Sequence, residues 1–94
     1  MTIRTVRVII SGRVQGVCFR METERAAEKY GVNGWVRNRR DGSVEALFQG
    51  DSRSVDDVLK WCAQGPPLAV VRDVRIFEEP FQEGLTDFMV RHTS

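Results

Sequence analysis

The stretch Ser11-Gly12-Arg13-Val14-Gln15-Gly16-Val17-Cys18-Phe19-Arg20 marks the boundary between a strand and a helix. The valine- and isoleucine-rich residues 3–11 predict a β-strand before the boundary, and the apolar spacing of residues 19–30 predicts a helix after it. Gly12 and Gly16 bracket a short turn, where positive φ angles would let several backbone N–H groups point to one spot. The helix start adds a positive dipole end, and Arg20 adds a guanidinium. We therefore expect a pocket for a tetrahedral anion at this turn.

The other strands are predicted by short runs of β-branched and aromatic residues. Residues 35–38 predict a second strand, and Asp41-Gly42 predicts a tight hairpin turn that leads into a third strand over residues 44–48. A fourth strand is predicted further on, and the chain ends with a short strand around Phe88 and Val90. The fourth strand is indicated by Val70, Val71, Val74 and Ile76.

A second helix is predicted between the third and fourth strands. Ser52 or Ser54 is expected as its N-cap, and with Ser54 in that role Asp57 falls at N3, close to a capping box. The sequence Gly65-Pro66-Pro67 ends this helix. Its buried stripe, at positions i, i+3, i+4 and i+7, is predicted to consist of Val55, Val58, Leu59 and Cys62.

The predicted order is β-α-β-β-α-β with an additional short C-terminal strand. Two βαβ halves joined by a hairpin predict an α+β fold, the ferredoxin-like α/β sandwich, with an antiparallel sheet and two helices on one face. A chain of 94 residues is expected to form a single domain, over residues 1–94. In this topology the second strand is parallel to the first, so Asn38 at its end should lie on the same side of the sheet as the turn.

The composition argues against several classes of function. Fourteen Lys and Arg residues oppose thirteen Asp and Glu residues, and this formal charge of +1 argues against non-specific binding to nucleic acid. No stretch approaches the ~20 apolar residues of a membrane span, and the N-terminus lacks the apolar segment of a signal peptide. A cytoplasmic protein is therefore expected, with neither nucleic acid nor membrane as a partner. Two cysteines and one histidine are too few for a zinc cage. No cofactor is expected.

Arg20 and Asn38 are the residues that we expect to act on a substrate. Backbone amides of the turn and Arg20 would hold a phosphate, while the Asn38 carboxamide would accept a hydrogen bond from a water molecule. Because a carboxamide is not a strong base, the substrate needs a good leaving group. The carboxylate of an acyl phosphate is such a group, and catalysis would then consist of positioning and electrostatic stabilisation.

Each of these features also has a simpler interpretation. The turn can be a plain connection, Arg20 can pair with Glu24 on the helix surface, and Asn38 can be an ordinary strand-end residue. An arginine is disfavoured by the dipole in the first turn of a helix, which favours the anion site. A thiol-phosphatase interpretation of Cys18 is disfavoured, because only two positions separate it from Arg20. A disulfide between Cys18 and Cys62 is conceivable, although Cys62 also fits the apolar stripe.

Three motifs resemble the acylphosphatase family when taken together. They are Gly12-Arg13-Val14-Gln15-Gly16-Val17-Cys18-Phe19-Arg20, Gly34-Trp35-Val36-Arg37-Asn38 and Asp41-Gly42-Ser43-Val44-Glu45. The helix stop Gly65-Pro66-Pro67 and the terminal Phe88-Met89-Val90-Arg91 also look like that family, so the resemblance spans nearly the whole chain.

The resemblance implies a small enzyme that hydrolyses carboxyl–phosphate mixed anhydrides to a carboxylate and inorganic phosphate. It implies direct attack by a positioned water, with no metal and no phospho-enzyme. By resemblance, Arg20 and Asn38 are the catalytic residues, and Asn38 positions the water. The residues implied to bind the phosphate are Val14, Gln15, Gly16, Val17, Cys18, Phe19 and Arg20.

The expected partner is a small-molecule acyl phosphate, with inorganic phosphate or sulfate as a competing ligand, and the expected state is a monomer. The alternative is a non-catalytic ferredoxin-like module that binds an anion or RNA. RNA-binding modules of this fold place aromatic residues on the exposed sheet face within an RNP-type motif, and no such motif occurs in the sequence. Trp35 and Trp61 are instead expected in the core.

Overall fold

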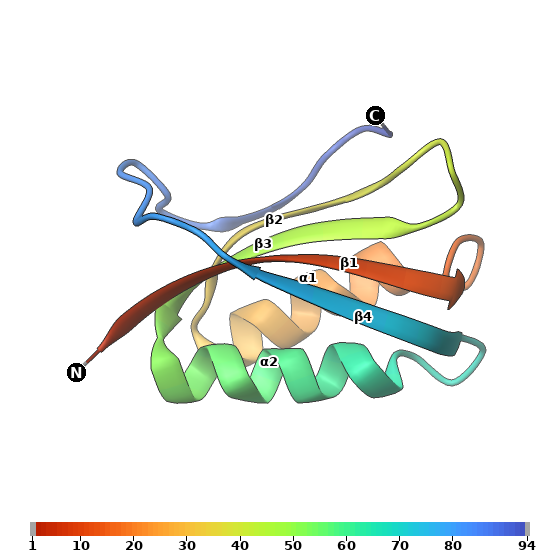
Figure 1. Ribbon diagram of the computed structural model, residues 1–94, viewed down its shortest axis with the longest axis horizontal. Coiled ribbons are helices and arrows are strands. Elements are labelled where there is room, and N and C mark those ends of the chain that lie inside the picture. The colour runs from red at the N-terminus through yellow and green to blue at the C-terminus, as the bar shows by residue number, and fades with distance from the viewer. Residues whose placement is uncertain (1, 94) are drawn as a thin grey trace.

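The computed structural model describes residues 2–93, in which two helices and five strands follow one another in the predicted order (Figure 1). Each element is close to its predicted position, and the first helix has the predicted bounds. The elements are β1 (Ile3–Arg13), α1 (Phe19–Tyr30), β2 (Asn33–Asn38), β3 (Val44–Asp51), α2 (Ser52–Gln64), β4 (Val70–Glu78) and β5 (Phe88–Val90).

The strands form one sheet in the order β4-β1-β3-β2-β5. β1 pairs antiparallel with β3 and β4, and β2 pairs antiparallel with β3, as the ferredoxin-like topology requires. The prediction of an antiparallel sheet is wrong for β5, which pairs parallel with β2. The chain reverses its direction between β4 and β5, and this reversal makes β5 antiparallel to β4 and therefore parallel to β2. Both helices cover the same face of the sheet (Figure 1).

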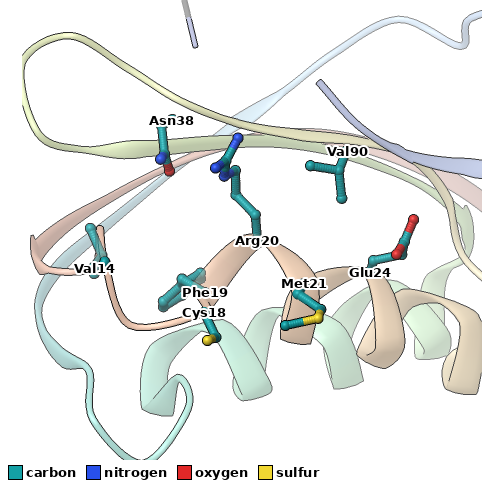
Figure 2. Close-up of a pocket in the computed structure, with 9 residues that line it drawn as sticks. Val14, Cys18, Phe19, Arg20, Met21, Glu24, Asn38 and Val90 are labelled. Carbon is teal, nitrogen blue, oxygen red and sulfur yellow. The ribbon is translucent and has the colours of Figure 1, made fainter. Parts of the chain in front are cut away.

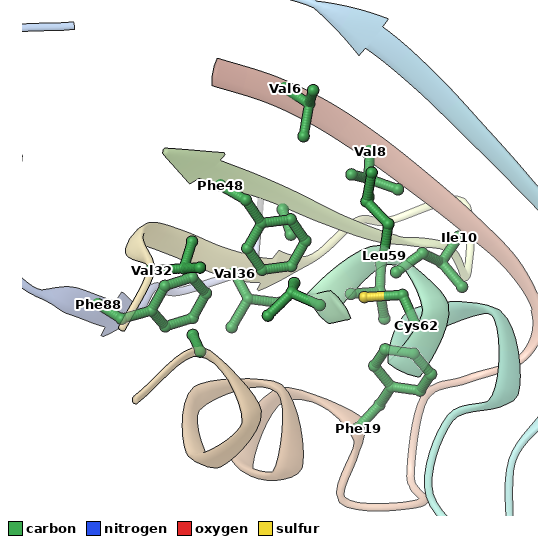
Figure 3. Packing of buried hydrophobic residues seen from close by; sticks show 14 of the residues in the cluster. Val6, Val8, Ile10, Phe19, Val32, Val36, Phe48, Leu59, Cys62 and Phe88 are labelled. Atoms are coloured by element: carbon green, nitrogen blue, oxygen red, sulfur yellow. The ribbon is translucent and has the colours of Figure 1, made fainter. Parts of the chain in front are cut away.

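The core lies between the sheet and the two helices. Alternate residues of β1 point into it, namely Val6, Val8 and Ile10, and all three are fully buried. Phe48 of β3 stacks on Phe88 of β5 with ring centroids 5.7 Å apart, which fixes the last strand to the sheet (Figure 3). Burial of each large apolar side chain contributes about 1.5–3 kcal/mol. The predicted stripe of α2 is buried at every position, Val55, Val58, Leu59 and Cys62.

The two helices end as predicted, but α2 begins differently. Gly31 is the left-handed C-cap of α1, and the Gly65 N–H bonds the Trp61 carbonyl at the end of α2. The predicted serine N-cap of α2 is wrong, because the helix begins at Ser52 itself, after Asp51. β3 runs into α2 without a loop, and the backbone N–H of Ser52 is bonded instead by the carbonyl of Thr2, 2.8 Å away.

The prediction that Trp35 lies in the core is wrong. Trp35 is not in the core but lies half-buried on the sheet face opposite the helices, 4.9 Å from the guanidinium carbon of Arg37 and 4.9 Å from that of Arg91. Its neighbour along the strand, Val36, occupies the core face, so strand alternation turns Trp35 outward.

Cys18 is exposed, Cys62 is buried, and both thiols are free, so the conceivable disulfide is not formed. No helix within residues 2–93 is long and apolar enough to cross a membrane.

Candidate active site

The loop between β1 and α1 is fixed to the core by three apolar side chains. Val14, Val17 and Phe19 are 1%, 6% and 2% exposed, and all three belong to the main hydrophobic cluster. Phe19 also packs on Trp61 near the end of α2, with ring centroids 5.5 Å apart. Because these side chains are buried in the core, the loop backbone between them stays at the surface.

The turn begins later than predicted. β1 continues through Arg13, and Gly12 lies within the strand, at a β-bulge opposite Val71 of β4. Gly12 therefore does not start the turn, because it still pairs with β4. The left-handed residues of the loop are Gly16, with φ of 76°, and Cys18, with φ of 62°. Cys18 is the one non-glycine residue of the described chain with positive φ, and such strain of about 1–3 kcal/mol gathers at functional sites.

The backbone N–H groups of residues 15–21 take part in none of the hydrogen bonds found within residues 2–93. The first bond of α1 runs from the Glu22 N–H to the Cys18 carbonyl, over 3.0 Å, and the Cys18 side chain caps no N–H group. Successive free N–H groups in a turn that enters a helix N-terminus form a concavity that attracts anions. This loop therefore has the backbone chemistry of a phosphate site.

Arg20 extends from the first turn of α1 toward the sheet (Figure 2). Its Nη1 donates a hydrogen bond to the carbonyl oxygen of Arg91 over 3.3 Å. The alternative pairing with Glu24 is not observed, and no carboxylate of the described residues forms an ion pair with Arg20. The remaining donors of the guanidinium are therefore available to a ligand.

Asn38 is the last residue of β2 and lies opposite Arg20 (Figure 2). Strand alternation places it on the same face as the buried Val36, which is the face that the helices cover. Within residues 2–93 its side chain has no hydrogen-bond partner, so its carboxamide is free to bind a ligand or a water molecule. Asn38, Arg20 and Gly16 line one cleft of about 520 Å³, as the topology predicted for the arginine and the asparagine.

Comparison with known proteins shows the family to which this chain belongs. The family model for acylphosphatases matches residues 6–90. The chain belongs to the acylphosphatase family. An acylphosphatase of Rubrobacter xylanophilus is 52% identical over 88 residues, which are 94% of this chain and 80% of that protein.

Solved acylphosphatase structures have the same fold. The crystal structure of the acylphosphatase from Bacillus subtilis is 34% identical, with a TM-score of 0.90 over 96% of this chain and 99% of that one. The acylphosphatase from Coxiella burnetii is 36% identical, with a TM-score of 0.91 over 95% of this chain and 93% of that one. The predicted ferredoxin-like fold is thereby confirmed.

The acylphosphatase cleft has a second part that the sequence did not indicate. Met21, Glu24 and Val90 line it beside Arg20, and among the described residues that line the cleft Glu24 carries the only carboxylate (Figure 2). Glu24 was within reach of sequence reasoning, because it follows Arg20 by one helical turn. Val90 was not, because its place depends on the parallel pairing of β5 with β2.

Two predicted phosphate-binding residues, Gln15 and Val17, are not among the residues that line the cleft. The side chain of Val17 is buried in the core, and that of Gln15 points to the hairpin between β2 and β3. Val14, Gly16, Cys18 and Phe19 line the cleft, and their binding of phosphate stays a prediction.

The β2–β3 hairpin next to Asn38 is tightly closed. Arg39 N–H bonds the Ser43 carbonyl over 2.8 Å, and Asp41 accepts hydrogen bonds from both the backbone N–H and the hydroxyl of Ser43. These two bonds lower the pKa of the Asp41 carboxyl. The arginines of the hairpin are largely paired within the fold, since Arg37 binds Glu45 and Arg39 lies 3.8 Å from Asp41. This pairing favours an ordinary solvated hairpin tip over a separate anion-attracting cluster.

Proposed function

We propose that this chain is an acylphosphatase enzyme, which cleaves an acyl phosphate with water to give a carboxylate and inorganic phosphate. The observation that carries the proposal is the free N–H groups of residues 15–21, in a loop that lines the same cleft as Arg20 and Asn38. Family membership and the fold of solved acylphosphatases support the reaction.

The phosphoryl group is held by the loop and by Arg20. Backbone N–H groups of residues 14–19 donate to its oxygens, the N-terminus of α1 adds a positive dipole end, and the guanidinium donates two parallel hydrogen bonds. These donors also face the charge that develops on the equatorial oxygens as the bond to the leaving group breaks. Inorganic phosphate and sulfate have the same oxygen geometry and compete for this site.

Asn38 positions the water that attacks phosphorus. Its carboxamide oxygen accepts a hydrogen bond from the water, and its fixed place at the end of β2 holds that water beside the bound phosphoryl group. A new bond forms from the water oxygen to phosphorus while the bond to the acyl oxygen breaks. The electron pair leaves with the carboxylate, and the proton of the water passes to a phosphate oxygen.

A strong base and a metal ion are not needed in this mechanism. A carboxylate is a weak base and leaves without prior protonation, and the Arg20 guanidinium together with the backbone N–H groups already opposes the phosphate charge. Within residues 2–93 there is no group of three or more His, Cys, Asp or Glu side chains suited to a metal ion. We expect hydrolysis to continue at full rate in the presence of a chelator.

The test is benzoyl phosphate hydrolysis by wild type, Arg20→Ala and Asn38→Ala, with and without EDTA. Arg20→Ala should raise the Ki of inorganic phosphate about 100-fold, because a charge-assisted pair of hydrogen bonds is lost. Asn38→Ala should leave this Ki within about twofold but lower kcat by roughly 100-fold or more, because only the attacking water is displaced. Matched controls are Arg25→Ala and Asn33→Ala, which change the same residue types on the same helix and strand outside the cleft.

Three outcomes would contradict the proposal. A wild-type chain without turnover of benzoyl phosphate would reject the activity. Unchanged kcat in Asn38→Ala would reject the role of Asn38 in positioning the water. Loss of activity on addition of chelator, restored by a divalent cation, would reject the metal-free reaction.

A further inference from the structure

The side chain of Gln15 connects the anion-binding loop to the β2–β3 hairpin. Its Nε2 donates to two backbone carbonyls of the hairpin, that of Arg39 over 2.7 Å and that of Ser43 over 2.9 Å. Both N–H hydrogens of the carboxamide are thereby used. The same two carbonyls close the hairpin itself, since they also accept the N–H groups of Gly42 and Arg39. Gln15 therefore binds the turn at the two carbonyls that its own backbone hydrogen bonds use.

The two segments that Gln15 joins carry the two halves of the site. Gln15 lies one position before Gly16, in the loop that presents free N–H groups, and Arg39 directly follows Asn38. Within residues 2–93, no other side-chain hydrogen bond links residues 14–18 with residues 39–43. Gln15 thus adds a direct polar link between the two segments, beside the β2–β3 pairing that holds Asn38 and the core that holds the loop.

The loop and the strand ends at the base of the hairpin share one apolar cluster, but the tip of the hairpin lies outside it. Val14 and Val17 anchor the loop in the core, whereas the hairpin extends beyond the sheet and is closed by its own bonds, including those from Ser43 to Asp41. Without the Gln15 bonds, we expect each segment to keep its own conformation while the direct link between the loop and the tip of the hairpin is lost. A half-buried carboxamide with two short bonds is suited to provide that link.

We propose that Gln15 is a positioning residue, which sets Asn38 in register with the phosphoryl group while its own backbone N–H belongs to the anion loop. This inference rests on the proposed function. It differs from a purely structural role in one respect: Gln15 acts through Asn38. Loss of the side chain should therefore lower kcat more than phosphate affinity, and the loss should disappear where Asn38 is already absent.

The experiment is a double-mutant cycle of Gln15→Leu and Asn38→Ala, with kcat and KM for benzoyl phosphate, Ki for inorganic phosphate, and the midpoint of urea unfolding. Leucine keeps most of the volume and removes both donors. We expect Gln15→Leu to lower kcat about tenfold and to change the Ki less than about threefold. In the Asn38→Ala background the same change should lower kcat less than about twofold, because residues that act as a unit are not additive.

Two further variants keep the test decisive. Gln15→Asn retains the carboxamide but is one methylene too short to reach both carbonyls, so it should also lower kcat and serves if the leucine variant does not fold. Asn33→Ala is the matched control, because it removes a carboxamide-to-carbonyl bond, to Leu85 over 3.0 Å, at the other end of the same strand. This control should change stability and leave kcat unaltered.

The outcomes separate this inference from the proposed function. If Gln15→Leu loses stability but retains kcat, or if its tenfold loss persists in full without Asn38, the positioning role is wrong while the enzyme activity stands. If the wild-type chain does not hydrolyse benzoyl phosphate, both are wrong. Selective loss of kcat, confined to chains that contain Asn38, would support the role.

Discussion

Replacement of Gly12 or Gly16 by alanine should have very different effects, although both residues belong to one short motif. An alanine Cβ at Gly12 would lie 2.1 Å from the carbonyl oxygen of Val70 and 2.9 Å from the backbone nitrogen of Arg72. Gly12 also has φ of 127°, which L-residues rarely adopt. At Gly16, with φ of 76°, a Cβ meets no atom within 4 Å. The first glycine is needed because β4 approaches closely, and the second only because of its backbone angle.

The expected losses follow from these distances. Alanine at Gly16 pays the cost of a left-handed L-residue, and the net loss is about 1 kcal/mol because alanine also restricts the unfolded chain. At Gly12 the Cβ is about 1 Å closer to backbone than real contacts allow, so β1 and β4 must separate where they pair. Separation of the strands and the backbone strain together should exceed about 3 kcal/mol.

Urea unfolding followed by circular dichroism measures both variants, and thermal unfolding provides a second estimate. Gly16→Ala should lower Tm by roughly 4–8 °C, and Gly12→Ala by more than roughly 12 °C, for a domain of this size. Both unfolding curves should keep the wild-type m-value if unfolding stays two-state. Equal losses for the two variants, or a Gly12→Ala chain within about 1 kcal/mol of wild type, would refute the close approach of β4 as the reason for the first glycine.

Three further predictions concern single side chains. Burial raises the pKa of the Cys62 thiol, so iodoacetamide at neutral pH should label Cys18 alone in the native chain and both cysteines in urea. Labelling of both cysteines in the native chain would contradict the buried position of Cys62. Hydrogen bonds from Ser43 lower the pKa of Asp41 in the folded state, so its stabilising contribution is complete above the unfolded value of about 3.9 and is lost as the pH falls below it. Asp41→Asn should therefore reduce the loss in free energy of unfolding, measured by urea titration, as the pH falls from 6 to 2. Glu24→Gln should raise the ratio of kcat/KM for succinyl phosphate to kcat/KM for acetyl phosphate about two- to fivefold at low salt. The reason is that the Glu24 carboxylate at the cleft repels an anionic acyl group, and the effect should be smaller at 1 M salt.

Features that depend on neighbours in the sequence could be predicted from the sequence. The bounds of α1 followed from its apolar spacing and from Gly31, and the hairpin followed from Asp41-Gly42. The presence of Arg20 and Asn38 in one cleft could also be predicted, because it requires only that β2 runs parallel to β1. In each case the deciding residues lie within one element or one simple topology.

Features decided by distant partners were predicted wrongly or missed. The N-terminus of α2 is bonded by the carbonyl of Thr2, a residue some fifty positions earlier that no capping pattern identifies. The error for Trp35 is of another kind, because its outward position follows from the alternation with its neighbour Val36, a local pattern that the expectation of a core position overlooked. Val90 enters the cleft only through the register of β5 on β2, which local patterns do not encode.

The anion loop shows why a short motif can specify a site so well. Val14, Val17 and Phe19 are all buried, and their burial leaves the N–H groups between them without partners in the fold. The same packing that stabilises the loop therefore leaves free the N–H groups that we propose bind the phosphate. Gln15, between two of these anchors, is left to point sideways, toward the hairpin. In the proposed function, one stretch of chain thus uses its apolar side chains for stability, its backbone for the phosphate, and its one carboxamide to hold the opposite half of the site in place.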